Sequence, residues 1–222
     1  MRIIEIFSRL EHLLIRLVES KVLPDDSYLA GGTAVYFYFP QRISVDIDFF
    51  TQKPFMAETV LFKIRKLIKE TKVEILEKDT LIAYLSPEKI KFSLFFLPYK
   101  LLSPLKSYEL KPGIVIDLAS LDDIEAMKAI ALVQRGSAKD FVDLYYLLKE
   151  TSHSFEGLSL MVRKKYGLDK EYDYHLKKAL VYFDDAEREL EGIWLVGKKG
   201  RARKISAKNW QQIKDFFISL CR

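Results

Sequence analysis

The stretch from Ala30 to Phe50, AGGTAVYFYFPQRISVDIDFF, restricts the fold of this chain more than any other part of it. Near its end, Asp46 and Asp48 alternate with apolar residues, and residues two apart on a strand point to the same face. We therefore expect the two carboxylates side by side, with Ile47 and Phe49 in a core. Like charges this close favour protonation unless a cation lies between them. A divalent metal with oxygen ligands and substrate phosphates, as is typical of Mg²⁺, would remove that conflict.

The first part of the stretch predicts a cradle for an anion. Gly31 and Gly32 follow a short apolar segment and allow the backbone to turn tightly and to approach a ligand closely. Thr33 is expected to cap a short aromatic helix that runs to Phe39, and the free N–H groups of its first turn would receive an anion. The chain then returns through a polar turn to the acidic strand.

Each of these motifs alone has an ordinary explanation. Gly-Gly-Thr is more often a turn followed by a helix cap, and Asp-x-Asp is more often a solvated strand edge. Their combination, with twelve residues between Thr33 and Asp46, resembles the signature of the DNA polymerase β-like nucleotidyltransferase superfamily. The finer pattern, GGTA followed by R-x-S-x-D-I-D-F-F, is similar to the AbiEii/AbiGii-type nucleotidyltransferase toxin family.

The chain departs from the superfamily pattern at the third metal ligand. The resemblance implies a third carboxylate on a later strand, where the run from Ile90 to Phe96 offers Ser93. Glu74, Asp117, a water molecule or the substrate phosphates are the alternatives for this ligand, and the sequence leaves the choice among them open.

A second group of charged residues lies on two consecutive predicted helices. By themselves, these residues would be surface ion pairs and helix caps, worth about 0.2 to 0.5 kcal/mol for each pair. Their spacing, K-x-x-A-x-x-x-R-G-x-x-K-D-x-x-D-L-Y-x-L, resembles the second conserved block of the same family. The residues that match it with charged side chains are Lys128, Arg135, Lys139, Asp140 and Asp143.

The resemblance implies a nucleotidyltransferase that uses a nucleoside triphosphate and Mg²⁺, with one or two metal ions held by Asp46 and Asp48. It assigns catalytic roles to Asp46, Asp48, Lys128 and Asp143, with Asp143 activating the acceptor or orienting Lys128. Lys139 and Asp140 would be supporting residues. The residues implied in nucleotide binding are Gly31, Gly32, Thr33, Arg42, Ser44, Lys128 and Arg135. The implied partners are an acceptor such as the 3′ end of a tRNA and a cognate antitoxin.

The periodicity of the chain predicts an α+β fold with a mixed or antiparallel sheet and flanking helices, followed by a helical C-terminal half. Strands are expected at residues 72–77, 81–85 and 89–97, running antiparallel beside the acidic strand, and helices at 122–134, 137–149, 155–166, 172–183 and 208–220. Residues 98–112 carry three prolines and predict an irregular connection. We expect residues 1–112 to form the nucleotidyltransferase core and residues 113–222 to form a helical domain that completes the active-site cleft.

Composition limits the remaining possibilities. A single cysteine, Cys221, excludes a disulfide framework, and the absence of long apolar runs predicts a cytoplasmic protein without a membrane span. The net charge of +5 and the basic segment 197–204 agree equally with a solvated loop and with RNA binding. A catalytically impaired relative that binds RNA or another protein is the alternative to the enzyme.

Overall fold

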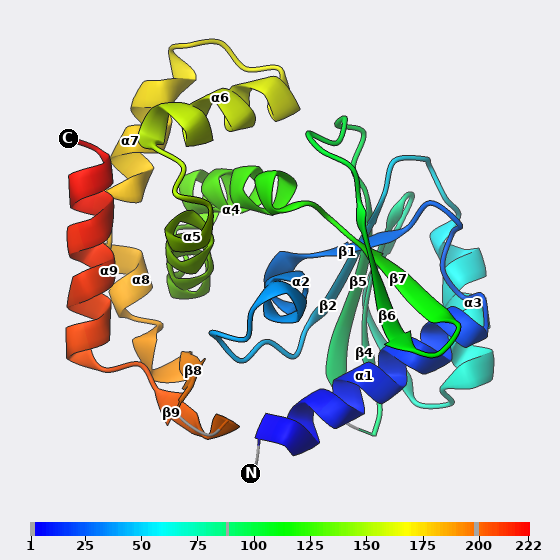
Figure 1. The fold of residues 1–222 in the computed structure, drawn as a ribbon. Coiled ribbons are helices and arrows are strands. Elements are labelled where there is room, and N and C mark those ends of the chain that lie inside the picture. Colours follow the sequence, from blue (N-terminus) through cyan, green and yellow to red (C-terminus); the bar gives the residue numbers. More distant parts are fainter. Residues whose placement is uncertain (1–2, 88, 198–199) are drawn as a thin grey trace. The chain divides into compact units, whose positions relative to one another are not determined.

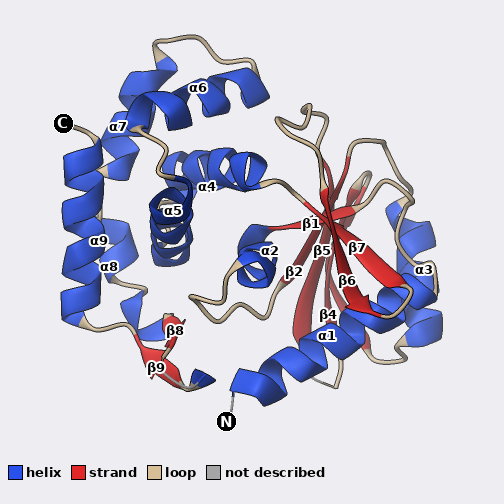
Figure 2. Ribbon diagram, in the orientation of Figure 1, coloured by secondary structure: helices blue, strands red, loops and turns tan. Residues whose placement is uncertain are grey.

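The computed structural model describes residues 3–87, 89–197 and 200–222, with side chains described from residue 8 onward. It contains a seven-stranded mixed sheet and a largely helical C-terminal half, which confirms the expected α+β class (Figures 1 and 2). The chain forms two compact units. Unit 1 comprises Met1–Ala34, Ser44–Lys100 and Leu105–Ala119, and unit 2 comprises Val35–Ile43, Leu101–Pro104 and Ser120–Arg222.

This grouping differs from a single division after residue 112. Strand β7 (Ile114–Leu118) pairs with β1 (Tyr28–Ala30) and therefore belongs to the sheet of unit 1. Residues 35–43 belong to unit 2, so the chain passes between the units within helix α2 (Gly31–Tyr38). The functional roles expected for the two halves stay predictions.

The sheet of unit 1 has the strand order β3-β4-β5-β2-β1-β7-β6. Its other strands are β2 (Ile47–Thr51), β3 (Thr71–Glu77), β4 (Thr80–Leu85), β5 (Ile90–Phe96) and β6 (Lys106–Lys111). Helix α1 (Ile3–Glu19) contacts β6 and β7, and helix α3 (Ala57–Leu67) contacts β3 and β4. Because α1 and α3 also contact each other, they cover the same face of the sheet (Figure 1).

Strand β5 pairs parallel with β2, whereas the sequence predicted an antiparallel neighbour for the acidic strand. Helix α3 is the crossover that follows β2 and precedes β3, and two antiparallel pairings, β3 with β4 and β4 with β5, follow it. Two reversals restore the direction of β3, so β5 and β3 run in the direction of β2. The predicted antiparallel direction was therefore wrong for β5 beside β2. The other neighbour of β2, strand β1, is antiparallel, so the sheet is mixed.

The connection predicted as irregular contains strand β6, which forms an antiparallel hairpin with β7. Pro112 and Gly113 supply the turn, and Gly113 has φ of +79°. β6 lies at the edge of the sheet, and most of its residues are exposed. An edge strand with charged residues lacks the apolar pattern of a central strand, which is why the sequence did not reveal it.

Unit 2 consists mainly of helices, which are α4 (Leu121–Arg135), α5 (Ala138–Thr151), α6 (Phe155–Tyr166), α7 (Tyr172–Leu180), α8 (Asp184–Glu187) and α9 (Ala207–Leu220). All five predicted helices are present, with bounds shifted by at most a few residues. A 3₁₀ turn (Leu190–Gly192), helix α8 and a hairpin of β8 (Trp194–Val196) and β9 (Ala202–Lys204) were not predicted. No helix within the described part of the chain is both long and apolar enough to cross a membrane.

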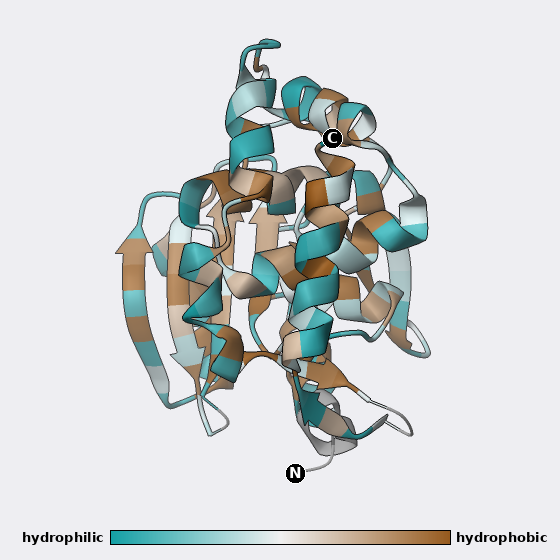
Figure 3. Cartoon of the chain, turned by 90° about the vertical axis from the view of Figure 1, so that its left-hand side faces the viewer, coloured by the Kyte–Doolittle hydropathy of each residue, from teal (hydrophilic) through white to brown (hydrophobic). Residues whose placement is uncertain are grey.

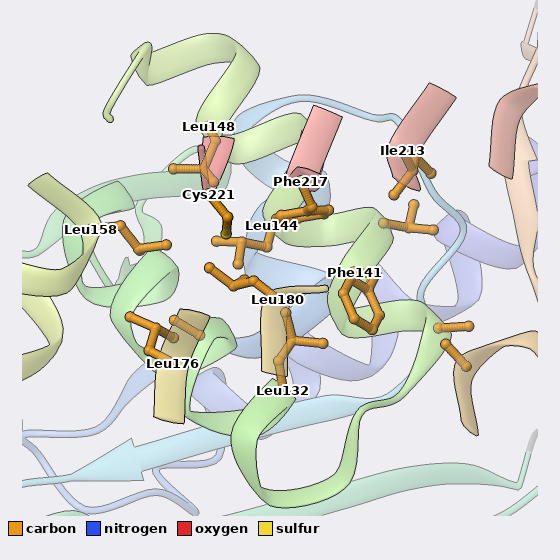
Figure 4. Packing of buried hydrophobic residues seen from close by; sticks show 14 of the residues in the cluster. Leu132, Phe141, Leu144, Leu148, Leu158, Leu176, Leu180, Ile213, Phe217 and Cys221 are labelled. Carbon is orange, nitrogen blue, oxygen red and sulfur yellow. The ribbon is translucent and has the colours of Figure 1, made fainter. Parts of the chain in front are cut away.

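The core of unit 2 is built around Phe141 of α5. Its ring contacts those of Phe183, Trp210 and Phe217 at centroid distances of 5.2, 5.9 and 5.4 Å. Figure 4 shows Phe141 and Phe217 among the packed residues of this core. Trp210, Ile213 and Phe217 recur every three or four residues along α9, and this spacing gives the helix its buried side. Figure 3 shows hydrophilic and hydrophobic segments alternating along the same C-terminal helix. This core holds α4 and α5, which carry the second charged group.

Candidate functional site

Asp48 lies on strand β2 of unit 1, and Asp46 lies one residue before this strand begins. Ile47 and Phe49 are 0% and 1% exposed, whereas Asp48 keeps partial access to solvent. Asp46 directly precedes the strand and is also partly exposed. The expected alternation of buried and partly exposed residues is present from Ile47 to Thr51, and both aspartates are partly exposed. That the two carboxylates lie side by side stays a prediction.

The glycine turn lies directly against Asp48. Ala30 pairs with Asp48 in the antiparallel register of β1 and β2, and Gly31 follows with φ of +68°. A Cβ atom built on Gly31 would lie 2.7 Å from Oδ2 of Asp48, closer than real Cβ contacts. Glycine is therefore required at this position for two reasons: the backbone is left-handed, and the Asp48 carboxylate lies too close for a Cβ atom.

We expect Gly31→Ala to reduce nucleotidyl transfer more than tenfold, because the added methyl group displaces the Asp48 carboxylate. The left-handed backbone adds a stability cost of about 1 to 2 kcal/mol. Gly113→Ala is the matched control, because Gly113 has a similar φ but no atom within 4 Å of the added Cβ. It should lose similar stability in urea unfolding and keep full activity. Equal activity losses in both variants would contradict a specific role for the contact with Asp48.

Thr33 links the glycine turn to the acidic strand, although it does not cap the helix as predicted. Helix α2 begins at Gly31, so Thr33 lies within its first turn. The Thr33 hydroxyl donates to the backbone carbonyl of Asp46 and lies 3.2 Å from the hydroxyl of Ser44. Both side chains are buried. Direct contact of these hydroxyls with a nucleotide is therefore disfavoured in this arrangement, and a role for the backbone amides in holding phosphate stays a prediction.

No third carboxylate joins Asp46 and Asp48 among the described residues. Ser93 of β5 pairs with Asp48, as the sequence suggested. Glu74 forms an ion pair of 3.1 Å with Lys91, and Asp117 accepts a hydrogen bond of 2.8 Å from Ser107. Across residues 3–87, 89–197 and 200–222, no three His, Cys, Asp or Glu side chains are grouped as a metal site would require.

Lys128, Asp140 and Asp143 of the second charged group form a buried network within unit 2, together with Arg42 and the exposed Arg135. Arg42 donates to both oxygens of Asp143, at 2.6 and 2.8 Å. Lys128 lies 2.7 Å from Asp143 and 2.9 Å from Asp140. Asp140 also accepts two hydrogen bonds from Arg135, at 2.7 and 3.1 Å. Asp140 and Asp143 are 0% and 1% exposed, so the interpretation as ordinary surface ion pairs was wrong.

Electrostatics within this network keep its members charged. Burial by itself would raise the pKa of Asp143, but Arg42 and Lys128 outweigh it and hold that pKa well below its ordinary value of 3.8. Burial would lower the pKa of Lys128, but Asp143 and Asp140 raise it. A carboxylate that stays ionised accepts protons poorly. Of the two roles left open for Asp143, the orientation of Lys128 agrees better with these contacts than the activation of an acceptor.

We expect acid to destabilise unit 2 through Asp140 and Asp143. The pKa values of both are lower in the folded protein than their ordinary value of 3.8. Their contribution to stability is therefore present above that value and is lost as pH falls through the folded-state values. The free energy of unfolding in urea should decrease as pH is lowered below about 4. The decrease in unfolding free energy for each pH unit should be smaller in Asp143→Asn than in the wild-type protein. The same pH dependence in both proteins would contradict the role of Asp143 in acid destabilisation.

The network also anchors the loop that leads into Ser44. Arg42 forms an antiparallel bridge with Leu195 of β8, and the Ile43 amide donates to the Trp194 carbonyl at 2.9 Å. The role predicted for Arg42 at the nucleotide stays a prediction, and the contacts described for this residue lie within unit 2. Within the described part of the chain, no ion pair involves Lys139. The pairing with β8 was missed because it joins segments that are about 150 residues apart.

Comparison with known proteins agrees with this geometry. The family model described as "Nucleotidyl transferase AbiEii toxin, Type IV TA system" matches residues 13–220. An uncharacterized protein of Aquifex aeolicus is 40% identical over 200 residues, which cover 87% of this chain and 85% of that protein.

Two solved structures share the fold at low sequence identity. The nucleotidyltransferase toxin MenT4 from Mycobacterium tuberculosis has a TM-score of 0.53 at 14% identity, covering 96% of this chain and 82% of MenT4. A Helicobacter pylori protein described as a proposed nucleotidyltransferase has a TM-score of 0.57 at 15% identity, covering 95% and 90% of the two chains. Because the family model matches residues 13–220 of its 222 residues, the chain belongs to the AbiEii family of nucleotidyltransferase toxins of type IV toxin–antitoxin systems.

Proposed function

We propose that this nucleotidyltransferase moves a nucleoside monophosphate from a nucleoside triphosphate to a hydroxyl group of an RNA acceptor, in a reaction that depends on Mg²⁺. The 3′ end of a tRNA is the proposed acceptor. The observation that carries this proposal is the pair of partly exposed aspartates at the start of β2, with the glycine turn packed against Asp48.

The residues of unit 1 fit a divalent cation. Asp46 and Asp48 offer hard oxygen donors two residues apart, and Mg²⁺ is usually bound by one or two carboxylates together with substrate phosphates. Two neighbouring carboxylates without a cation would repel each other. When bound, the cation would supply charge neutralisation and a lower pKa for a bound hydroxyl group.

The chemistry is a substitution at the α-phosphorus atom. The acceptor oxygen forms a bond to this phosphorus, the bond to the bridging oxygen of the β-phosphate breaks, and pyrophosphate leaves with the electron pair. The acceptor proton passes to solvent. Asp46 and Asp48 would hold the cation, which would help to orient the reacting phosphate, and the Gly31–Gly32 turn would allow the backbone to approach the phosphates closely.

Residues of unit 2 support this reaction in two proposed ways. The resemblance gives Lys128 and Arg135 the task of neutralising the triphosphate, and this role stays a prediction because their described contacts are with Asp140 and Asp143. Arg42 has a positioning role, because its bond to Asp143 fixes the loop that continues into Ser44 and Asp46. Membership of a type IV toxin family further implies a cognate antitoxin.

One assay tests the proposal. The protein is incubated with each α-³²P-labelled nucleoside triphosphate, Mg²⁺ and either total tRNA or tRNA that lacks an accessible 3′ hydroxyl. We expect label on intact tRNA only, and loss of labelling in EDTA. If a protein became labelled instead of tRNA, the acceptor would be a protein hydroxyl group, and the reaction would still be nucleotidyl transfer. RNA binding that persists in EDTA, with no labelling by any nucleotide, would favour a non-catalytic RNA-binding protein and overturn the proposal.

A further inference from the structure

The positive charge of this chain is concentrated in one short segment. Residues 194–214 contain seven of the 36 Lys and Arg residues and none of the 31 Asp and Glu residues, so the rest of the chain has 29 basic against 31 acidic residues. Within this segment Arg201, Arg203, Lys204 and Lys208 are exposed. A local excess of positive charge attracts polyanions even where the net charge of the whole protein is small.

An exposed tryptophan lies next to this charge, on the β8–β9 hairpin (Figure 2). Trp194 is 41% exposed and pairs with Lys204 in the antiparallel register, which places both side chains on one face of the hairpin. Nζ of Lys204 lies 5.7 Å from the centre of the Trp194 ring. Leu195 points to the other face, is 1% exposed and belongs to the core of unit 2. The face with Trp194 and Lys204 is therefore turned away from this core.

A third segment of unit 2 extends this outer face. The bridge between Arg42 and Leu195 fixes an antiparallel register. One residue further along, the Ile43 amide donates to the Trp194 carbonyl at 2.9 Å, so these two residues are neighbours across the pair. Ile43, Trp194 and Lys204 thus form an apolar, aromatic and basic row, here called the hairpin platform. The chain reaches the first of the two aspartates three residues after Ile43, a span of at most about 11 Å.

The hairpin platform combines the two features by which proteins bind single-stranded nucleic acid. A base can stack on an exposed aromatic ring, and cationic side chains beside the ring can meet the phosphates. In a duplex the faces of the bases are already stacked on one another, so the ring of Trp194 would gain little from it. An acidic peptide would match the charge of the segment but would offer no planar group to the ring. The chemistry of the platform therefore favours a single-stranded nucleic acid.

We propose that the β8–β9 hairpin binds a single-stranded segment of the RNA acceptor, with one base stacked on Trp194 and a neighbouring phosphate at Lys204. This inference rests on the proposed function, which supplies the RNA acceptor. The hydrogen bond between Ile43 and Trp194 ties the platform to the chain segment that continues into Asp46. The basic residues of segment 194–214 add affinity that does not depend on the base sequence.

Tryptophan fluorescence tests the stacking directly, because the chain has two tryptophans and Trp210 is only 4% exposed. The full-length protein is titrated with a single-stranded oligoribonucleotide in EDTA and without nucleoside triphosphate. We expect binding to quench the tryptophan emission of the wild-type protein. Trp194→Phe should bind the RNA within about threefold, since a phenyl ring also stacks on bases, and its remaining emission from Trp210 should not change. Quenching that persists in Trp194→Phe would overturn the proposal.

Affinity for the same oligoribonucleotide, measured by fluorescence anisotropy of a dye on its 5′ end, tests the contribution of the ring. Trp194→Ala should weaken binding about tenfold or more, because the stacking surface is lost. Tyr174→Ala on α7 is the matched control, since Tyr174 is a 72% exposed aromatic residue of unit 2 outside the basic segment. It should bind like the wild-type protein, and circular dichroism should show a native fold for both variants. Equal affinities of the two variants would overturn the role of Trp194.

The salt dependence of binding tests the role of Lys204. Lys204→Gln should reduce the slope of log K against log salt concentration by about 0.7, which corresponds to one phosphate contact on a single strand. Lys178→Gln removes an exposed lysine of α7 and should leave the slope unchanged. A blunt-ended RNA duplex of the same length should bind more weakly than the single strand. Equal binding of duplex and single strand would show that charge alone attracts RNA and would overturn the stacking.

Because binding is measured in EDTA, this inference and the proposed function can fail separately. RNA binding that depends on Trp194, without transfer of any nucleotide in Mg²⁺, would support the hairpin platform and overturn the enzymatic proposal. Transfer to RNA together with equal RNA affinity of the wild-type protein and Trp194→Ala would overturn only the hairpin platform. Self-association of the wild-type protein that is lost in Trp194→Ala, measured by sedimentation velocity, would assign the platform to a second copy of this chain and also overturn the inference.

Discussion

Replacement of Asp48 or Asp46 by Asn is expected to lower the rate of nucleotidyl transfer about a thousandfold or more, equivalent to about 4 kcal/mol of transition-state stabilisation. Asn keeps the size of the side chain but removes the negative charge that a divalent cation requires. Single-turnover transfer of α-³²P label at saturating nucleotide measures this effect. Because both side chains are partly exposed, the fold should persist.

The control for this pair is Asp117→Asn, which removes a carboxylate from β7 of the same sheet. Asp117 bonds Ser107 and is not grouped with Asp46 and Asp48 in the described structure. The Asp117 variant should keep nearly full activity. In the wild-type protein, Mg²⁺ and nucleotide together should raise the melting temperature, and this increase should be absent in Asp48→Asn. Full activity of the Asp46 and Asp48 variants would refute their proposed role.

Asp143→Ala is expected to cost about 3 to 5 kcal/mol in the free energy of unfolding, a large part of the roughly 5 to 15 kcal/mol typical of a folded domain. The side chain is buried and bonded to Arg42 and Lys128, whose side chains are only 10% and 8% exposed. Its removal leaves these two cations buried without their main partner. Urea unfolding followed by circular dichroism measures the loss.

Glu150→Ala is the matched control, because it removes a carboxylate from the exposed side of the same helix, α5. It should change stability by less than about 0.5 kcal/mol. The double variant Arg42→Met/Asp143→Leu should recover part of the stability lost in Asp143→Ala, since it removes a pair instead of one partner. A loss for Asp143→Ala as small as that for Glu150→Ala would contradict the buried network.

Local patterns made the acidic strand and the main helices predictable. The alternation of Asp46, Ile47, Asp48 and Phe49 encodes one buried and one accessible face within four residues, and the structure follows it. The three- and four-residue spacing of apolar side chains likewise gave the helices of unit 2. Even the place of Ser93 beside Asp48 was predicted, because the resemblance fixed which strand should lie there.

Contacts between distant segments were not predictable in the same way. The pairing of Arg42 with Asp143 spans 101 residues, so no local pattern distinguished a guanidinium that binds a carboxylate from one that binds phosphate. The parallel direction of β5 depends on the crossover through α3, and the edge strand β6 lacks an apolar stripe. In each case the structure depends on contacts with segments far away in the sequence, and local sequence patterns do not identify those segments.

The central claim is that Asp46 and Asp48 together hold the divalent cation that carries the triphosphate. The most direct measurement is anomalous X-ray diffraction from crystals grown with Mn²⁺ and a non-hydrolysable nucleoside triphosphate. We predict a manganese peak about 2 Å from a carboxylate oxygen of each residue and in contact with the phosphates. A bound nucleotide whose metal lies away from both carboxylates, or carboxylates that point to different sites, would contradict the account.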